Sequence, residues 1–288
     1  EILQQLGPNG RLYAIDRDPA AIAAAAPLQA DARFHITHSP FAALAQIAEQ
    51  QQLVGKIDGI LLDLGVSSPQ LDEAERGFSF MRDGPLDMRM DQSRGRTAAQ
   101  VLNESDPGDL VRILHEYGEE KFADRIVRAI VTERDRQPIE TSGRLVEIIT
   151  RAIPVAVRHK RSGHPVKRTF QALRIAVNRE METLSAVLPR ALDRLNVGGR
   201  IAVLAYHSLE DRPVKEVFRE ACDDTAPAGL PIVPESMAAK FSPVTRGAER
   251  PDADEMSANP RSASARLRVI ERVRPGSVNR QHVTKESR

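Results

Sequence analysis

The sequence predicts an α/β protein in which a parallel β-sheet is interrupted by an all-helical insert. Short apolar runs alternate with helical patterns in the first 65 residues and again after residue 200. Between them, residues 97–153 contain helical patterns only. Alternating strands and helices are typical of βαβ units. We therefore expect the sheet to begin before the insert and to resume after it.

The first part of the chain predicts three strands, each followed by a polar turn. The strand patterns cover residues 10–16, 34–37 and 56–63, and the helical patterns cover residues 19–26 and 41–50. Asp18 and Pro19 start the first of these helices, because aspartate is a good N-cap and proline fits the first helical position. Residues 56–63 are apolar nearly throughout, which predicts a strand covered on both faces.

The middle of the chain predicts a long loop and then helices. Residues 66–96 are polar and punctuated by glycine and proline, as in a functional loop or lid. Within residues 97–153, apolar side chains such as Phe122, Ile126 and Ile130 recur every four residues, which indicates helices.

The last part predicts a return to the sheet. One apolar stripe predicts a long helix that ends near Gly198-Gly199 and contains Leu173, Val177, Leu184, Leu188 and Leu195. Strands are expected over residues 201–206 and 265–273, with a helix over residues 211–222 and a loop over residues 224–262. The final dozen residues are polar, and we expect them to be frayed.

Composition excludes several classes of protein. Lys+Arg is 41 and Asp+Glu is 40, and 41% of residues are hydrophobic, which argues against wholesale disorder. The single cysteine, Cys222, excludes an intramolecular disulfide and fits a reducing compartment. The longest apolar stretch, Ala20 to Leu28, is interrupted by Pro27 and is far shorter than the roughly 20 residues of a membrane span. We expect a soluble, cytoplasmic protein with no membrane partner.

A basic window lies between Glu147 and Glu180, where no acidic residue occurs. It holds Arg151, Arg158, His159, Lys160, Arg161, His164, Lys167, Arg168, Arg174 and Arg179. Such an excess indicates a surface that binds a polyanion, or else a solvated face balanced by acids from elsewhere in the fold. With 4% aromatic residues and no Trp, broad base-stacking platforms are not expected.

Polar groups at the ends of strands mark the candidate ligand site, since ligands bind beyond the carboxyl ends of parallel strands. Asp16 suits the hydroxyls of a ribose, as in dinucleotide and S-adenosylmethionine enzymes, or it simply caps a helix. The segment from Asp63 to Gln70 includes a glycine and two serines, which allow close approach of a ligand or form a tight turn. His207 is a general base or a residue that orients a neighbour.

Other chemistries lack their motifs. No Cys and His residues have the spacing of zinc ligands, so no metal is expected. The chain also has no phosphate-binding P-loop motif.

Five blocks of sequence resemble one known family. They are residues 10–19 (GRLYAIDRDP), 57–91 (from IDGILLDLGVSSPQLD to RGFSFMRDGPLDMRMD), 117–123 (YGEEKFA), 168–178 (RTFQALRIAVN) and 207–212 (HSLEDR). Together they closely resemble the bacterial small-subunit (16S) ribosomal-RNA cytosine-N(4) methyltransferase family, of the MraW type. The resemblance runs from near residue 1 to about residue 273.

The resemblance implies a Rossmann-like S-adenosyl-L-methionine (SAM) methyltransferase sheet with an inserted all-helical domain. The methyltransferase domain would comprise residues 1–82 and 166–288, and residues 83–165 would form the helical insert and contact RNA. The implied substrate is a cytidine in the decoding region of small-subunit rRNA, within the rRNA or the 30S subunit, and the protein would be a monomer or a dimer. The family's cofactor contacts fall on Asp16 (ribose), Phe41 (adenine), Asp63 and Gln70.

The implied chemistry suggests roles for further residues. The cytosine amine is a poor nucleophile, so the site must hold it in line with the methyl group and accept a hydrogen bond from it. Asp63 is the candidate acceptor, or a backbone carbonyl aided by Ser67 or Ser68. The Asp-Leu-Gly-Val turn carries no aromatic residue to stack on the base. The candidate RNA contacts are Arg158, Lys160, Arg161, Lys167, Arg168, Arg174 and His207.

The sequence departs from the family pattern at its start. The pattern includes an upstream Gly-Gly-His-Ser loop and the strand that leads into it, and the printed chain begins after them. A chain without them is expected to bind SAM weakly or not at all. Two alternatives remain: a nicotinamide dehydrogenase, whose Gly-x-Gly-x-x-Gly turn is not in the chain, and an rRNA-binding assembly factor that has lost catalysis.

Overall fold

The computed structural model describes residues 1–155, 164–227, 229–230 and 232–276, and it confirms the α/β class. The chain divides into two units. Unit 1 comprises Glu1–Ser39 and Val66–Glu180, and unit 2 comprises Pro40–Gly65 and the chain from Met181 onward. No helix within the described ranges is long and apolar enough to cross a membrane.

A parallel pair of strands opens unit 1. β1 (Leu12–Asp16) pairs with β2 (Phe34–His38), in a register that places Asp16 opposite His38. The short helix α1 (Ile2–Gln5) precedes the pair, and α2 (Pro19–Ala24) lies between its strands in sequence. As predicted, Asp18 caps α2, and its side chain accepts a 2.9 Å hydrogen bond from the Ala20 N–H.

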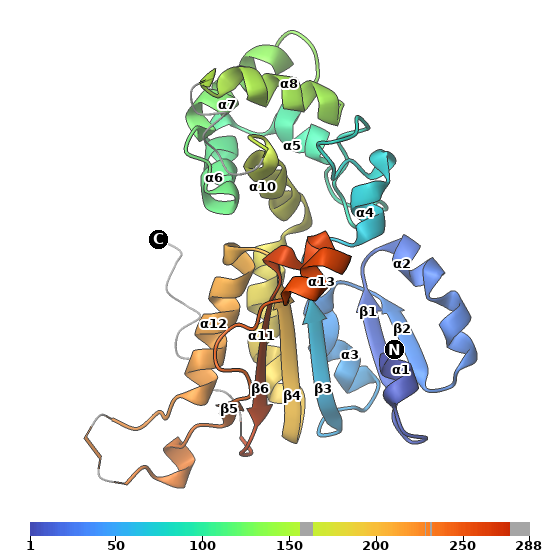
Figure 1. Cartoon of the computed structure of the whole chain (residues 1–288), viewed down its shortest axis with the longest axis vertical. Coiled ribbons are helices and arrows are strands. Elements are labelled where there is room, and N and C mark those ends of the chain that lie inside the picture. The colour runs from blue at the N-terminus through green and yellow to red at the C-terminus, as the bar shows by residue number, and fades with distance from the viewer. Residues whose placement is uncertain (156–163, 228, 231, 277–288) are drawn as a thin grey trace. The chain divides into compact units, whose positions relative to one another are not determined.

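Helices form over residues 97–153 of unit 1, as the sequence predicts, whereas the predicted loop over residues 66–96 also contains one short α-helix (Figure 1). Beyond the strand pair, the α-helices in the described part of unit 1 are α4 (Ser68–Asp72), α5 (Ala98–Glu104), α6 (Pro107–Gly118), α7 (Ala123–Arg134), α8 (Ser142–Ala152) and α10 (Lys167–Asn178). The predicted stripe is buried, with both Ile126 and Ile130 at 0% exposure. These side chains belong to one apolar cluster that extends from Phe78 to Leu173. Burying such stripes against one another is the main source of stability for short helices.

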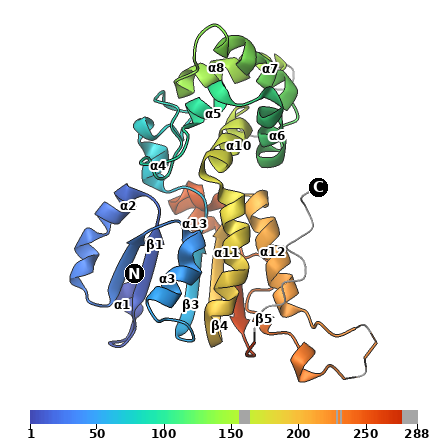
Figure 2. The ribbon, with the colours of Figure 1, turned by 180° about the vertical axis from the view of Figure 1, so that it is seen from behind.

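A four-stranded sheet forms the centre of unit 2, in the order β3-β4-β6-β5. β3 (Ile57–Asp63) is parallel to β4 (Leu195–Ala205), whereas β6 (Arg266–Arg272) and β5 (Phe241–Pro243) are antiparallel to their neighbours. Seen from the two sides in Figures 1 and 2, α3 (Leu44–Gln50) and α11 (Glu180–Arg194) cover the same face of this sheet. α12 (Ser208–Cys222) packs against β4, β5 and β6.

The prediction that residues 56–63 are covered on both faces was wrong. Ile60 and Leu62 are buried, but Leu61 between them is 50% exposed. Alternate side chains of a strand point to opposite faces, so only the face beneath Ile60 and Leu62 is covered. The apolar Leu61 made the run look continuous in the sequence.

The predicted long helix is two helices. α10 ends at Asn178, and Arg179 adopts a left-handed conformation with φ 51° before α11 begins. A left-handed residue is a common helix end, although glycine usually occupies it. α11 ends at Arg194 rather than near Gly198-Gly199, and β4 begins at once, six residues before the predicted strand.

The predicted loop over residues 224–262 also contains regular structure. It holds β5 and α13 (Ala253–Ala258), which are too short to give a periodic pattern. The frayed end predicted for the final dozen residues lies outside the described part of the chain. The proposed domain division, with an insert over residues 83–165, stays a prediction.

Candidate functional site

Asp16 ends β1, where the sequence predicts a ligand-binding carboxylate. Its Oδ1 accepts a 2.8 Å hydrogen bond from the backbone N–H of Asp18. A carboxylate has about four acceptor positions, so this bond orients Asp16 and leaves capacity for hydroxyl donors. The carboxylate therefore fits the ribose role that the resemblance implies.

Asp18 lies at the centre of a buried network that we call the Asp18 cluster, formed by Asp18, Gln70 and Arg76. The Oδ2 atom of Asp18 accepts 2.7 Å and 2.9 Å hydrogen bonds from Gln70 Nε2 and Arg76 Nη2. The side chains of Arg76 and Asp18 are only 6% and 7% exposed. Buried charges are stable only when they are paired and hydrogen-bonded, and here each charge has its partner.

The same arginine holds the loop that follows it. Arg76 Nη2 also donates to the carbonyls of Arg89 at 3.2 Å and Met90 at 3.0 Å. On another side of this loop, the Asn178 amide donates to the Met88 carbonyl at 2.7 Å and accepts from the Met90 N–H at 2.9 Å. Met88 is fully buried with φ 60°, a conformation that persists only where the surroundings enforce it.

Gln70 and Ser67 form the start of α4. The Ser67 N–H donates to Gln70 Oε1 at 3.1 Å, and the Ser67 hydroxyl accepts from the Gln70 N–H at 3.4 Å. This reciprocal pair is a capping box. Gln70 is 5% exposed, and its side chain is hydrogen-bonded to Ser67 and Asp18. Ser68, the first residue of the helix, is exposed. A contact between Gln70 and a cofactor stays a prediction, as do the catalytic roles of Ser67 and Ser68.

In unit 2, the strand ends of β3 and β4 carry a second network, which we call the Asp63 cluster: Asp63, Tyr206, His207 and Glu210. Asp63 is exposed at the end of β3, and its Oδ1 accepts a 3.0 Å hydrogen bond from the Tyr206 hydroxyl. Burial raises the pKa of Tyr206 to about 12, helped by the charge of Asp63 and by this hydrogen bond. Tyr206 is therefore a protonated donor at neutral pH.

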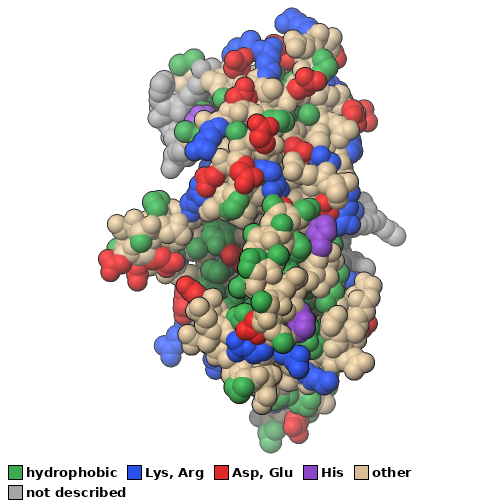
Figure 3. Space-filling view, turned by 90° about the vertical axis from the view of Figure 1, so that its right-hand side faces the viewer, with side chains coloured by type: hydrophobic (Ala, Val, Ile, Leu, Met, Phe, Trp, Pro, Cys, Tyr) green, Lys and Arg blue, Asp and Glu red, His purple; other side chains and the backbone are tan. Residues whose placement is uncertain are grey.

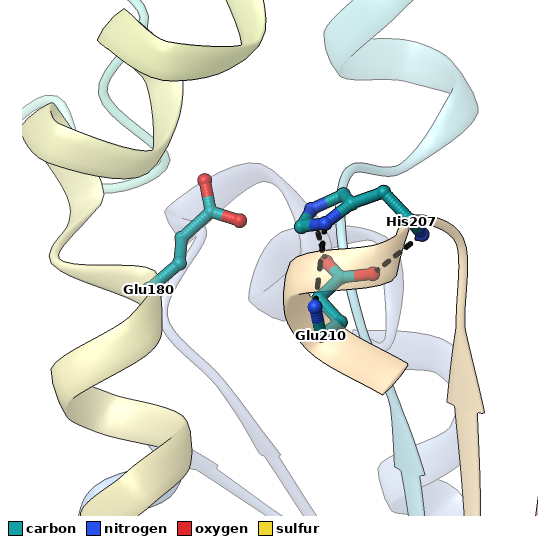
Figure 4. A group of neighbouring side chains, drawn as sticks. All are labelled: Glu180, His207 and Glu210. Atoms are coloured by element: carbon teal, nitrogen blue, oxygen red, sulfur yellow. Dashed lines mark hydrogen bonds and ion pairs between the residues drawn. The ribbon is translucent and has the colours of Figure 1, made fainter. Parts of the chain in front are cut away.

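His207 and Glu210 form hydrogen bonds that stabilise the turn between β4 and α12 (Figure 4). His207 is the N-cap of α12, where its Nδ1 accepts from the Glu210 N–H at 3.3 Å. The Oε2 atom of Glu210 accepts from the backbone N–H groups of Tyr206 at 2.8 Å and His207 at 3.3 Å. His207 Nε2 lies 3.0 Å from Glu210 Oε1. Of the two roles predicted for His207, this geometry supports the orienting one.

Phe41, the predicted adenine contact, begins the 3-10 turn Phe41–Ala43 in unit 2. Its ring is partly buried and packs against the apolar cluster around the four-stranded sheet. The turn ends with Leu44, which starts α3. The contact with adenine stays a prediction.

For His207, described above, the predicted contact with RNA stays a prediction, and the other predicted RNA-binding residues fall into three groups. Arg158, Lys160 and Arg161 lie outside the described residues. Lys167 and Arg168 are exposed in the first turn of α10. Arg174 is half-buried and donates two 2.9 Å hydrogen bonds to the Glu180 carboxylate. Its charge is therefore paired with a carboxylate of the protein itself. On the face drawn in Figure 3, basic and acidic side chains are interspersed.

Sequence analysis missed the parts played by Tyr206 and Arg76. Tyr206 directly follows β4, the strand parallel to β3, so strand pairing gives a signal that it would lie near Asp63. Arg76 gives no such signal, because its partner Asp18 is 58 residues away in sequence. Of the predicted cofactor residues, Asp16 and Gln70 lie in unit 1 and are linked through Asp18, whereas Phe41 and Asp63 lie in unit 2.

Comparisons with known proteins agree on one family. The model of the MraW methylase family matches residues 1–273. The Ribosomal RNA small subunit methyltransferase H of Cutibacterium acnes (strain DSM 16379 / KPA171202) is 75% identical over 283 residues, which cover 98% of this chain and 84% of that protein.

Proposed function

Because this chain belongs to the MraW methylase family, we propose that it methylates the exocyclic N4 amine of a cytidine in the decoding region of small-subunit rRNA. The observation that carries this proposal is Asp63, an exposed carboxylate at the end of a parallel strand, held through one oxygen by Tyr206. The name of the Cutibacterium acnes relative supports rRNA of the small subunit as the substrate. We expect the reaction to take place in the cytoplasm.

We propose SAM as the methyl donor. Its sulfonium makes the methyl group electrophilic, and the protein has to bind and orient it. The residues proposed to bind it are Asp16, whose carboxylate fits the ribose hydroxyls, Phe41 for the adenine, Asp63 and Gln70.

Asp63 would act on the amine that receives the methyl group. A carboxylate is a natural hydrogen-bond acceptor for the cytosine N4 amine. The hydrogen bond localises the nitrogen lone pair and stabilises the positive charge that develops as the N–C bond forms. The methyl–sulfur bond would break as the N–C bond forms, so that the donor leaves as a neutral thioether. The methylated amine would then pass its surplus proton to Asp63 and on to water. Since a base within a helix cannot reach the site, the cytidine has to leave its stack first.

Exposed basic residues would hold the RNA backbone. Lys167 and Arg168 in α10 are exposed, and Lys160 and Arg161 precede them in the same basic window. Contacts to phosphate give affinity rather than choice of base. Replacing Lys160, Arg161 and Lys167 by Gln should weaken rRNA binding and flatten its salt dependence, as measured by filter binding over a range of KCl. An unchanged salt slope would contradict this role.

A transfer assay tests the function. The protein is incubated with SAM labelled in its methyl group and with 30S subunits or small-subunit rRNA, and the RNA is digested to nucleosides. We expect label in N4-methylcytidine and in no other nucleoside. Label in another nucleoside would overturn the cytosine-N4 proposal, and rRNA binding without label would favour the assembly-factor alternative.

Asp63→Asn tests the acceptor directly. It keeps the shape of the side chain but removes its charge, and turnover should fall by about 100-fold, the range seen when one transition-state hydrogen bond is lost. The rate constant of methyl transfer is measured under single-turnover conditions, and the affinity for SAM is measured by calorimetry. Intact turnover with normal SAM affinity would show that Asp63 is not the acceptor.

A further inference from the structure

Tyr206 lies where it can control the orientation of Asp63. The two residues come from neighbouring parallel strands, since Asp63 ends β3 and Tyr206 directly follows β4. The phenol hydroxyl lies 3.0 Å from Asp63 Oδ1. Asp63 is exposed, and an exposed carboxylate rotates freely unless a donor fixes it.

Tyr206 is itself held from two sides. Its backbone N–H donates to Glu210 Oε2 at 2.8 Å, and the Glu210 side chain is buried. Gly65, with φ +88°, lies against its ring: a Cβ built on Gly65 would be 3.5 Å from Tyr206 Cδ2. Glycine suits this position because it adopts positive φ without strain. A group fixed in this way provides a donor of defined direction.

We propose that Tyr206 is a positioning residue: its hydroxyl fixes Oδ1 of Asp63 so that Oδ2 is aimed at the amine of the substrate base. This inference rests on the proposed function and deepens it, because it states how one carboxylate serves two donors. A neutral hydroxyl suits this task, since it holds the carboxylate without neutralising its charge as a lysine or arginine would. The oxygen offered to the substrate therefore still belongs to a charged carboxylate, which accepts stronger hydrogen bonds than a neutral group.

Tyr206→Phe tests the proposal, because it removes the hydroxyl and keeps the ring. We expect kcat to fall about tenfold, as for loss of a hydrogen bond to a charged group, with the KM for rRNA unchanged. Tyr13→Phe is the matched control: Tyr13 stacks on His35 in unit 1, with ring centroids 4.7 Å apart, and its variant should keep full kcat. Equal thermal unfolding midpoints for both variants exclude a folding defect.

A double-mutant cycle separates positioning from a general structural effect. If Tyr206 acts through Asp63, adding Tyr206→Phe to Asp63→Asn should lower kcat less than twofold further. A full tenfold further loss in the Asp63→Asn background would overturn the proposal. So would an unchanged kcat in the single Tyr206→Phe variant.

A measurement without turnover keeps the test valid if the transfer assay itself fails. The phenol of Tyr206 is titrated by absorbance after a rapid alkaline jump, as the difference between the wild type and Tyr206→Phe. Asp63→Asn should lower this pKa from about 12, because the charge and hydrogen bond of Asp63 both raise it. An unchanged pKa would mean that the two side chains do not interact, and it would overturn the positioning role whatever the substrate is.

Discussion

The Asp18 cluster and the Asp63 cluster both place a carboxylate near the end of a parallel strand, but the hydrogen-bond partner of that carboxylate is charged in one and neutral in the other. Asp18 is buried and meets a cation, Arg76, whereas Asp63 is exposed and meets the neutral hydroxyl of Tyr206. A buried carboxylate without a cation would cost several kcal/mol, so Asp18 is committed to structure. The exposed Asp63 needs no such partner, and its charge remains available to a ligand.

The largest effect that follows from this comparison is expected for Arg76→Met. It leaves the Asp18 carboxylate buried without its cation and removes two hydrogen bonds to the loop carbonyls. The free energy of unfolding should fall by about 3–5 kcal/mol, as when one partner of a buried pair is removed. Urea unfolding followed by circular dichroism measures the change.

Arg96→Met is the matched control for Arg76→Met. Arg96 pairs with Glu104, but the two side chains are 50% and 56% exposed. Loss of an exposed pair costs at most about 1 kcal/mol. Equal losses for the Arg76 and Arg96 variants would remove the distinction between buried and exposed carboxylates on which the comparison rests.

The dependence of stability on pH gives a second test of the difference between buried and exposed carboxylates. Asp91 in unit 1 is also buried, with 1% of its side chain exposed. Burial alone would raise its pKa, but hydrogen bonds from Ser93 and Arg94 outweigh burial and lower the pKa to about 2. A lowered pKa stabilises the fold above the ordinary carboxyl pKa near 4, and this stabilisation is lost as the pH falls toward 2.

The thermal unfolding midpoint of the wild type should therefore drop between about pH 4 and pH 2. Asp91→Asn should start from a lower midpoint at neutral pH and show a shallower drop over the same range. Glu104→Gln, at an exposed position, serves as the control and should follow the wild type. Parallel curves for the wild type and Asp91→Asn would contradict the assignment of this acid sensitivity to Asp91.

The smallest effect is expected for Ser67→Ala, which removes the cap of α4. The Gln70 N–H loses its acceptor, while Gln70 keeps its bond to Asp18. Loss of an N-cap costs about 1 kcal/mol. A loss as large as that of Arg76→Met, in the same urea titration, would show that the cap rather than the ion pair holds the Asp18 cluster together.

Local patterns in the sequence predicted the elements that depend on near neighbours. The Asp18-Pro19 helix start, the helices α5–α8 and the strand ending at Asp63 all follow from residues within one or two turns. The break at Arg179 was missed because a non-glycine residue adopts the left-handed conformation there. The exposure of Leu61 was missed because a single apolar residue hides the alternation of its strand.

The site was harder to predict than the fold, because its partners are distant in sequence. Asp16 and Asp63 could be selected, since a carboxylate after an apolar run is visible in the sequence. The donor to Asp63 comes from Tyr206, 143 residues later, and the donor to Asp18 comes from Arg76 in a loop without periodicity. Only the pairing of strands and the packing of loops bring these groups together.

The pairing of β3 with β4 also bears on how the chain is made. The register joins Asp63 to Leu204, so β3 leaves the translating ribosome well before its partner strand exists. Residues 66–180, which belong to the other unit, are synthesised in the interval. An apolar strand with open edges is prone to pair with other chains. We therefore expect the nascent protein to be most vulnerable to aggregation after residue 63 and before residue 204 emerges, a period in which chaperone binding to β3 would protect it.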